Sequence, residues 1–349
     1  MSAAVWPDVI GRLLRREELP PEAVELAMST ILSGDASDAQ IAGFAVALRA
    51  KGETPAELAA LVRTMQRFAE HVNVGDVDGP LLDTCGSGGD RSGTVNVSTM
   101  AALVAAGAGA WVVKHGNRAA SSQCGSADVL EALGVAIDLG PDSVARCVRD
   151  TRIGFCFAPR FHAAMRFAGP VRRELGTPTT FNFLGPLANP AGVRRQVVGV
   201  SDPAMAPRVV DTLAELGAER ALVVYGHDGL DELTVASTST VHELRDGKVR
   251  VYDVDPAEYG IPIADRVSLL GGDAPGNADV VRKVLDGATG PVRDLVVLNA
   301  GAALVAAGLT DDLADGCEQA RAALDDGRAA GVLDDFVRVS SAEREAEAR

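Results

Sequence analysis

The spacing of apolar residues over positions 1 to about 72 predicts helices and no strands. Two of these runs follow a capping-box spacing, in which a hydroxyl residue stands three positions before Gln or Glu. The two boxes are Ser37-x-x-Gln40 and Thr54-x-x-Glu57, and Pro55 occupies the favoured first helical position. We expect the apolar faces of these helices to form a core or a dimer surface, and we assign no catalytic role to them.

From position 81 onward, short apolar runs alternate with helix-length stretches. Runs that are apolar on both sides suit a mostly parallel sheet covered by helices. The predicted strands are 81–84, 110–114, 154–158, 196–200, 221–225 and 295–298, with a hairpin formed by 240–244 and 249–251 around Asp246-Gly247. The sequence therefore predicts an α/β protein with a small all-helical N-terminal domain and a larger α/β domain that has a mostly parallel central sheet.

Two breaks in the pattern indicate how these domains divide. Residues 72–80 are rich in turn formers, and between 159 and 192 the pattern changes to a basic helix with Arg166, Arg172 and Arg173 and then to proline-rich turns. We interpret the second break as the chain leaving the sheet to rejoin the helical domain. The predicted domains are 1–75, joined by about 165–190, and 76–164 with 191–349. The charged tail 340–349 is expected to fray.

Composition excludes several classes of protein. The formal charge of −15 disfavours a nucleic-acid or anionic-membrane surface, because both need a basic patch. No signal-peptide pattern or uninterrupted 18-residue apolar span is present. The five cysteines are scattered without a CxxC pair, which argues against a zinc site and a disulfide framework. We therefore expect a cytoplasmic protein that uses neither nucleic acid nor a membrane as its partner.

Three successive segments between 83 and 126 have the features of phosphate-binding loops. A glycine-rich loop (Asp83-Thr84-Cys85-Gly86-Ser87-Gly88-Gly89-Asp90) follows an apolar strand, and Asn96-Val97-Ser98-Thr99 opens a helix-length run, whose free N–H groups favour anions. The third segment, Lys114-His115-Gly116-Asn117-Arg118, follows the next strand. A dinucleotide fingerprint is excluded because Arg91 replaces the required glycine, and no Gly-Lys-Ser/Thr of a P-loop follows. The alternative is a glycine-rich turn before an ordinary buried helix.

Further candidates allow two interpretations each. Asp231 and Glu232 follow a predicted strand and could hold Mg²⁺ through oxygen ligands, or could form an exposed acidic loop. Arg172 could bind a carboxylate bidentately, or lie on a solvated face. His162 could line a pocket, or be structural like most single histidines. Neither a Gly-x-Ser-x-Gly elbow nor HExxH occurs, so the sequence does not indicate a hydrolase or a zinc enzyme.

These segments resemble the anthranilate phosphoribosyltransferase family of the tryptophan pathway over nearly the whole chain. The resemblance rests on Gly86-Ser87-Gly88-Gly89-Asp90, Asn96-Val97-Ser98-Thr99, Lys114–Ser122, Gly125-Ser126-Ala127-Asp128, Phe181-Asn182-Phe183-Leu184-Gly185-Pro186-Leu187 and Gly229-Leu230-Asp231-Glu232. It implies transfer of 5-phosphoribose from phosphoribosyl pyrophosphate to the amine of anthranilate, with release of pyrophosphate. It also implies a homodimer formed through the helical domains.

The resemblance also implies roles for individual residues, none of them a general acid or base. Phosphoribosyl pyrophosphate would be enclosed by Gly86, Gly89, Asp90, Thr94, Asn96, Val97, Ser98, Thr99, Lys114, His115, Gly116, Asn117, Arg118, Ala119, Ala120, Ser121, Ser122 and Ser126. Anthranilate would contact Gly86, Asn117, His162 and Arg172, and Mg²⁺ would bind Ser98, Asp231 and Glu232. The chain departs from the family pattern at Ser87, usually Thr, at Ala163, usually Pro, and at Cys124, usually a smaller residue.

Two alternatives to this activity stay open at the level of the sequence. A pyrimidine nucleoside phosphorylase shares the expected fold and a similar glycine loop, but such chains are usually longer. A non-catalytic, nucleic-acid-binding relative would be expected to lack Asp231-Glu232 or to show a basic groove.

Overall fold

The computed structural model describes residues 5–88, 90, 92–119 and 122–349. Within them, a seven-stranded sheet has the order β3-β2-β1-β4-β5-β6-β7, in which the first five strands are parallel and the last two antiparallel. The strands are β1 (Leu81–Gly86), β2 (Trp111–Gly116), β3 (Ile153–Phe157), β4 (Arg195–Gly199), β5 (Arg220–Gly226), β6 (Ser239–Arg245) and β7 (Lys248–Val254). The predicted mostly parallel sheet and the hairpin are thus confirmed.

The hairpin between β6 and β7 forms because its turn residues adopt the backbone conformation that a tight turn needs. Asp246 and Gly247 both have positive φ, 52° and 70°, as a two-residue type I′ turn requires. Glycine adopts this conformation without a Cβ penalty, and Asp tolerates it. The turn places Arg245 opposite Lys248 and aligns the two strands.

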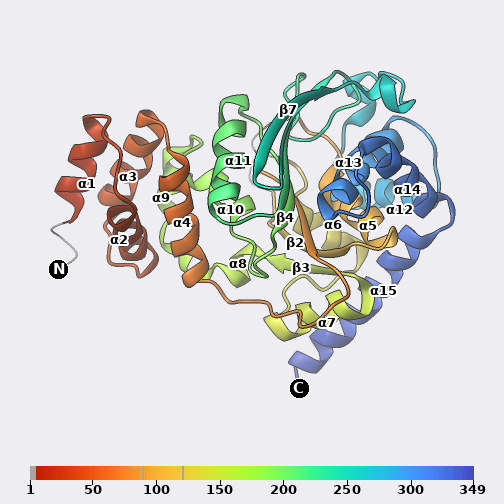
Figure 1. Ribbon diagram of the computed structural model, residues 1–349. Helices are drawn as coiled ribbons and strands as arrows, with labels where there is room; N and C mark the ends of the chain where they lie inside the picture. The colour runs from red at the N-terminus through yellow and green to blue at the C-terminus, as the bar shows by residue number, and fades with distance from the viewer. Residues whose placement is uncertain (1–4, 89, 91, 120–121) are drawn as a thin grey trace.

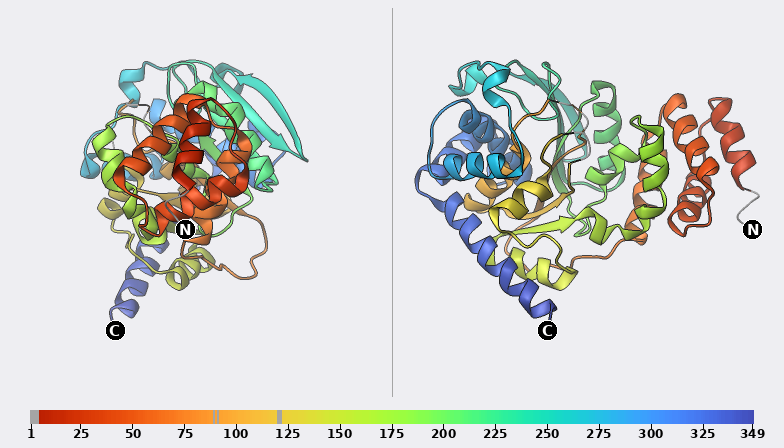
Figure 2. Two further views of the ribbon diagram at one scale, coloured as in Figure 1. Left: turned by 90° about the vertical axis from the view of Figure 1, so that its left-hand side faces the viewer. Right: turned by 180° about the vertical axis from the view of Figure 1, so that it is seen from behind.

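A bundle of four helices occupies one end of the molecule (Figure 1). It contains α1 (Val5–Leu14), α2 (Pro21–Leu32), α3 (Asp38–Lys51) and α4 (Pro55–Arg67). Both predicted capping boxes form, with Ser37 and Thr54 each accepting from the backbone N–H three residues later. The expected basic helix is two elements, η2 (Ala163–Phe167) and α9 (Gly169–Leu175), which contact α2 and α3 beside the bundle (Figure 2).

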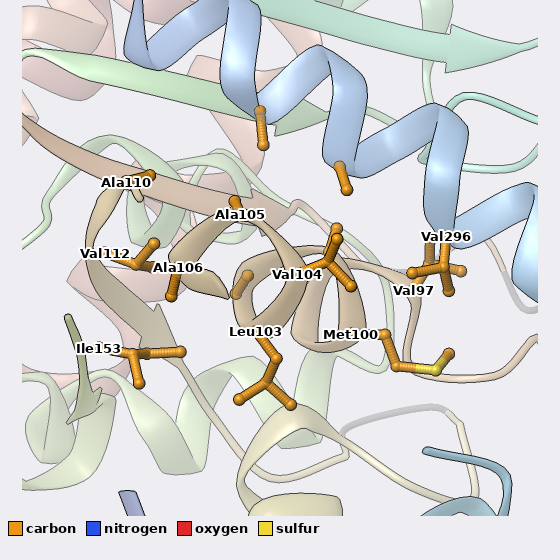
Figure 3. Packing of buried hydrophobic residues seen from close by; sticks show 14 of the residues in the cluster. Val97, Met100, Leu103, Val104, Ala105, Ala106, Ala110, Val112, Ile153 and Val296 are labelled. Carbon is orange, nitrogen blue, oxygen red and sulfur yellow. The ribbon is translucent and has the colours of Figure 1, made fainter. Parts of the chain in front are cut away.

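The remaining helices surround the sheet. They are α5 (Val97–Gly107), α6 (Ser126–Leu133), α7 (Pro141–Thr151), α8 (Ala158–Phe161), α10 (Phe181–Leu187), α11 (Ala206–Glu215), α12 (Ala274–Leu285), α13 (Pro291–Ala307), α14 (Leu313–Asp325) and α15 (Arg328–Glu347), with short 3₁₀ turns at η3 (Pro203–Met205), η4 (Pro256–Tyr259) and η5 (Arg266–Leu269). Helix α5 is buried between the sheet and α13, where Val104 and Met100 lie near Val296 (Figure 3).

Two hydrophobic cores cover opposite faces of the sheet. Val197 and Val198 of β4 belong to different cores because successive strand residues face opposite sides. One core holds α5 and α13. The other continues from the sheet through α11 and α10 into the bundle, so apolar packing fixes the position of the bundle against the sheet.

Two expectations were wrong. Residues 295–298 form no strand but lie inside α13, a helix that starts with Pro291 in its first turn and is buried from Leu295 to Ala307. Such all-round burial removes the periodicity that separates a helix from a buried strand. The C-terminal tail stays helical to Glu347, whose carboxylate accepts a hydrogen bond from the Gly140 N–H at 2.8 Å.

Candidate active site

The carboxyl ends of the parallel strands meet at one edge of the sheet. Strands β1, β2 and β4 end at Gly86, Gly116 and Gly199. Chain order reverses at β1, which has β2 on one side and β4 on the other. In open parallel sheets, ligands bind at such a switch point, outside the carboxyl ends of the strands.

Close backbone approach at this edge joins the glycine loop to Asp231. The Gly88 N–H donates to Asp231 Oδ2 at 2.8 Å. A Cβ on Gly86 would lie 2.5 Å from the same oxygen, and one on Gly199 would lie 1.5 Å from the Asp231 carbonyl oxygen. The Ser201 hydroxyl donates to the Gly88 carbonyl at 3.1 Å and holds the loop from the other side. Only glycine allows these contacts at 86 and 199.

Lys114 brings a buried positive charge to the same place. Its side chain is 2% exposed and donates to the Thr84 carbonyl and, at 3.2 Å, to the Ser98 hydroxyl. Ser98 lies in the first turn of α5, where the helix dipole is positive. The neighbouring Thr99 hydroxyl is buried and has no hydrogen-bond partner among the described residues. A buried positive charge beside a helix N-terminus is an arrangement that can bind an anion.

Four carboxylates gather near this lysine. Asp83 and Glu232 interact directly with the Lys114 charge, whereas Asp231 lies between Glu232 and Asp90. Burial raises the pKa of Asp83 to about 6. Burial also raises the pKa of Asp231, and the nearby negative charge of Asp90 raises it further. For Glu232, burial and the charge of Asp231 raise the pKa against the opposing effect of Lys114. The charge of one lysine does not balance these four carboxylates, so the site favours an added cation.

The donor set suits Mg²⁺ rather than a softer metal. Ser98, Asp231 and Glu232 offer only oxygen atoms, the ligands that Mg²⁺ prefers. Among the described residues, no group of three or more His, Cys, Asp or Glu side chains is arranged to hold a metal. The residues present therefore fit an ion that completes its shell with water and ligand oxygens, as Mg²⁺ usually does.

The second loop, after β2, is packed against the start of α6. The Asn117 carbonyl accepts from the Ala127 N–H at 3.1 Å and from the Ser126 hydroxyl at 3.2 Å. A Cβ on Gly116 would lie 2.2 Å from Ser126 Oγ, so this position also needs glycine. The Arg118 guanidinium is already paired with Asp128 at 2.9 Å and with Glu131 at 2.8 Å. Its side chain is thus less available to a ligand than the sequence suggested.

Two buried histidines lie together beneath this loop. Their ring centroids are 5.0 Å apart, and His115 Nδ1 bonds the Gly185 carbonyl at 2.9 Å. Burial lowers the pKa of His115 to about 3 and that of His162 to about 4, so both are neutral near pH 7. His115 Nε2 and both ring nitrogens of His162 are buried without a partner among the described residues. These polar atoms can receive a ligand or water.

Arg172 lies on α9, at the side of the helical bundle. Its guanidinium is partly buried, and within the described residues it makes no hydrogen bond or ion pair. Burial lowers its pKa, which shows that the charge is poorly solvated. Its neighbour Arg173 is exposed. A partly buried arginine without an acidic partner favours a carboxylate ligand, more strongly than the sequence alone indicated.

The structure therefore brings Gly86, Ser98, Thr99, Lys114, Asp231 and Glu232 together. Thr94 is four positions before Ser98 in the chain. It forms an isolated antiparallel β-bridge with Leu270 and lines a cavity of about 210 Å³. Among the described residues, no hydrogen bond or ion pair joins the Arg172 side chain to the loops. Gly89, Ala120 and Ser121, also expected at the site, lie outside the described residues.

Several residues that shape the site were not among those predicted from the sequence. Asp83 accepts from the His115 N–H at 3.1 Å and from the Asn189 side chain at 2.8 Å. Asn189 also donates to the Val113 carbonyl at 2.8 Å, so the pair connects the middle of β1 to the middle of β2. A carboxylate inside an apolar strand was the available signal for Asp83; Asn189 and Ser201 had none.

Two further observations bear on compartment and partners. All five cysteines are buried and free. Across the part of the chain that the structure describes, no helix is both long and apolar enough to span a bilayer.

Comparison with known proteins agrees with this arrangement. Residues 7–69 match the family described as glycosyl transferase family, helical bundle domain, and residues 78–330 match its a/b domain. The chain is 51% identical over 350 residues to the anthranilate phosphoribosyltransferase of Salinispora arenicola, covering 99% of each chain. It is 54% identical over 339 residues to that of Nocardioides sp., covering 96% of this chain and 98% of the relative.

Solved structures give the same relationship. The crystal structure of the Thermus thermophilus anthranilate phosphoribosyltransferase superposes with a TM-score of 0.90 at 43% identity, over 96% of this chain and 99% of that one. The Saccharomyces cerevisiae enzyme in complex with phosphoribosyl pyrophosphate and Mg superposes with a TM-score of 0.89 at 26% identity, over 97% and 98%. The chain is therefore a member of this glycosyl transferase family and, within it, of the anthranilate phosphoribosyltransferases.

Proposed function

We propose that this chain transfers 5-phosphoribose from phosphoribosyl pyrophosphate to the amine of anthranilate and releases pyrophosphate, as an enzyme of tryptophan biosynthesis. The names of its relatives support this reaction, and none of those reported above is a nucleoside phosphorylase or a nucleic-acid-binding protein. The observation that carries the proposal is the meeting of buried Lys114, the start of α5 and the carboxylates of Asp231 and Glu232 at one sheet edge.

The phosphate groups of the donor would be held by the two loops and the start of α5. Lys114, Ser98 and Thr99 supply a buried charge and hydroxyl groups there. The other residues that we propose to enclose this substrate are Gly86, Gly89, Asp90, Thr94, Asn96, Val97, His115, Gly116, Asn117, Arg118, Ala119, Ala120, Ser121, Ser122 and Ser126. Arg118 would contribute mainly backbone atoms, because its side chain is paired with Asp128 and Glu131.

The cation would be bound by Ser98, Asp231 and Glu232. These carboxylates are buried, and burial together with neighbouring negative charge raises their pKa values. A bound cation would compensate that charge and favour their ionised forms. A bound Mg²⁺ would stabilise negative charge on the departing pyrophosphate. The yeast relative in complex with phosphoribosyl pyrophosphate and Mg supports this choice of metal.

Anthranilate would be bound by Arg172, Asn117, His162 and the backbone at Gly86. Arg172 has no acidic partner among the described residues and suits the anthranilate carboxylate. His162 is neutral and its ring nitrogens have no partner among the described residues, so it would line the pocket and could form a hydrogen bond with the substrate. Binding by Arg172 would orient the amine toward the ribose C1 atom.

This arrangement explains catalysis without an assigned acid or base. Breaking the C1–pyrophosphate bond builds positive charge on the ribose and negative charge on the leaving group. Lys114 and the N–H groups of the loops stabilise the developing negative charge, which is usually the largest catalytic contribution. The aromatic amine is largely unprotonated near neutrality. Positioning by Arg172 then lowers the barrier, by up to about 7–11 kcal/mol in well-oriented systems.

The test is the loss of anthranilate fluorescence on adding phosphoribosyl pyrophosphate, with and without Mg²⁺. Rapid, metal-dependent loss is the expected result. Folded protein that gives no loss would contradict the proposed function, and thymidine with phosphate would then be the next substrate to test.

Assembly, domain division and location extend the proposal. Leu14, Leu26, Val46 and Phe68 are exposed apolar side chains on the bundle and support a homodimer formed through it.

Contacts of η2 and α9 with α2 and α3 support a helical domain of 1–75 joined by about 165–190, with 76–164 and 191–349 as the α/β domain. Free, buried cysteines support a reducing, cytoplasmic location.

A further inference from the structure

The side chain of Asn277, far from the loops in sequence, is bonded directly to Asn96. Asn277 lies in the first turns of α12 and is 2% exposed. Its Nδ2 donates to Asn96 Oδ1 at 2.9 Å, and its Oδ1 accepts from the Gly272 N–H at 2.7 Å. Asn96 Nδ2 in turn donates to the Cys124 carbonyl at 3.1 Å. The two amides therefore connect three chain segments.

This bond changes what Asn96 does at the start of α5. Asn96 is the N-cap residue of that helix, and an asparagine there normally accepts from the N–H two or three positions later. Here its side chain makes no cap hydrogen bond. Its side-chain oxygen, Oδ1, instead accepts a hydrogen bond from Asn277. At this helix start the Val97 N–H donates to the Val95 carbonyl at 2.7 Å, whereas the Thr99 hydroxyl has no partner among the described residues and stays available to a ligand.

The segment around Asn277 also holds the end of the glycine loop. The Gly271 N–H donates to the Gly93 carbonyl at 2.8 Å, and the Val95 N–H donates to the Leu269 carbonyl at 3.1 Å. A Cβ on Gly271 would lie 2.7 Å from Asn277 Oδ1, so glycine is needed for the approach. The segment just before Asn277 is therefore already bonded, through Leu269 and Gly271, to the chain on both sides of Thr94.

We propose that Asn277 is a positioning residue for the phosphoribosyl donor, acting through Asn96. Asn277 holds the side-chain oxygen of Asn96, Oδ1, away from the first N–H groups of α5. It also keeps Asn96 Nδ2 directed at the Cys124 carbonyl, which follows the second phosphate loop. This inference rests on the proposed function, because it assumes that the donor binds at the start of α5.

The Asn277→Asp variant tests the bond with the smallest change in shape. An aspartate at this position still accepts from the Gly272 N–H but cannot donate to Asn96 Oδ1. Asn96 then cannot keep its hydrogen bonds to both residue 277 and the Cys124 carbonyl. We expect the KM and calorimetric Kd for phosphoribosyl pyrophosphate, with Mg²⁺, to rise about tenfold or more. The KM for anthranilate and kcat should change by less than about threefold.

A double-mutant cycle tests whether Asn277 acts through Asn96. Asn96→Ala, Asn277→Ala and the double variant are compared, and the double variant should bind the donor no more weakly than Asn96→Ala alone. Additive effects, or an unchanged donor KM in folded Asn277→Asp, would overturn the inference. If Asn277→Ala does not fold, the aspartate variant still decides the outcome.

A matched control separates positioning from general stability. Ser340 is fully buried on α15 and accepts from the Ala136 N–H at 3.1 Å, remote from the loops. Ser340→Ala should lower the melting temperature without changing the donor KM; an equal rise in donor KM would count against a specific role for Asn277. Wild-type protein that binds phosphoribosyl pyrophosphate but is inactive would contradict the proposed function and not the inference about Asn277. The calorimetric Kd of the Asn277 variants for this donor would still test the inference.

Discussion

Asp231 and Gly88 are joined by a hydrogen bond of 2.8 Å from the Gly88 N–H to the Asp231 carboxylate. The residues are 143 positions apart in sequence. The bond ties the loop after β5, which carries the proposed metal ligands, to the glycine loop after β1. Space for it exists only because Gly86 and Gly199 lack side chains. A change at Gly86, whose added Cβ would come nearest to the Asp231 side chain, should therefore damage the site more than the fold.

The Gly86→Ala variant should lose activity while remaining folded. Its Cβ would lie 2.5 Å from Asp231 Oδ2 and would push the carboxylate out of place. Misplacement of about 1 Å at a catalytic site can cost about a hundredfold in rate, and we expect a loss of that order in kcat/KM. Gly331→Ala on α15 is the control, because nothing lies within 4 Å of its added Cβ. Full activity in Gly86→Ala would show that the loop adjusts freely.

The double variant Asp231→Asn with Glu232→Gln should lose most of its activity at ordinary Mg²⁺ concentrations. The variant keeps the shape of both side chains but removes the charges that we propose to bind the cation. Turnover should fall by more than about a hundredfold, measured by anthranilate fluorescence across a Mg²⁺ titration. Glu258→Gln, which changes an exposed acid, should behave as wild type. Unchanged turnover in the double variant would refute the metal role.

The Arg172→Ala variant should raise the KM for anthranilate selectively. A charge-assisted hydrogen bond contributes about 1.5–3 kcal/mol, which corresponds to a rise of about ten- to a hundredfold. The KM for phosphoribosyl pyrophosphate should change much less. Arg173→Ala is a matched control, since this neighbouring arginine on α9 is exposed. Equal effects on both substrates would argue against a carboxylate-binding role.

Asp83 should contribute to the free energy of unfolding at low pH, and this contribution should be lost as pH rises from about 4 to about 6. Burial raises its folded-state pKa from 3.8 to about 6, so the folded protein holds the proton more tightly than the unfolded chain. That contribution, up to about 3 kcal/mol, is complete below pH 4 and is lost as pH passes through the folded-state value. Denaturant unfolding at several pH values should show a flatter profile for Asp83→Asn. The exposed Glu345→Gln should keep the wild-type profile, and identical slopes in all three proteins would disprove the effect.

The Val46→Glu variant should weaken self-association. Val46 lies on α3 with 45% of its surface exposed, and a carboxylate there would be desolvated in an apolar interface. Light scattering after size exclusion should show a dimer for the wild type and more monomer for the variant. Val251→Glu, on the exposed edge strand β7, is the control because this residue is also exposed but lies outside the bundle. A wild-type monomer would contradict the proposed assembly.

Local patterns in the sequence predicted much of this fold. Capping boxes at Ser37 and Thr54, the Asp246-Gly247 turn and the five parallel strands are set by neighbours in the chain, and they form where the pattern indicates. The resemblance to a known family added roles for single residues, which stay predictions. The run from Leu295 was misassigned because a fully buried helix has no polar face to reveal its period.

By itself, the sequence determined that glycine loops and a helix start follow successive strands, because turn chemistry and periodicity are local properties. Only the tertiary structure decided which distant groups meet there. Asn189 reaches Asp83 across 106 positions, and Asn277 reaches Asn96 across 181. Nothing in the neighbourhood of either residue encodes such a contact. It arises because the packing of the sheet and helices brings the chain segments together and leaves buried polar groups that must find partners.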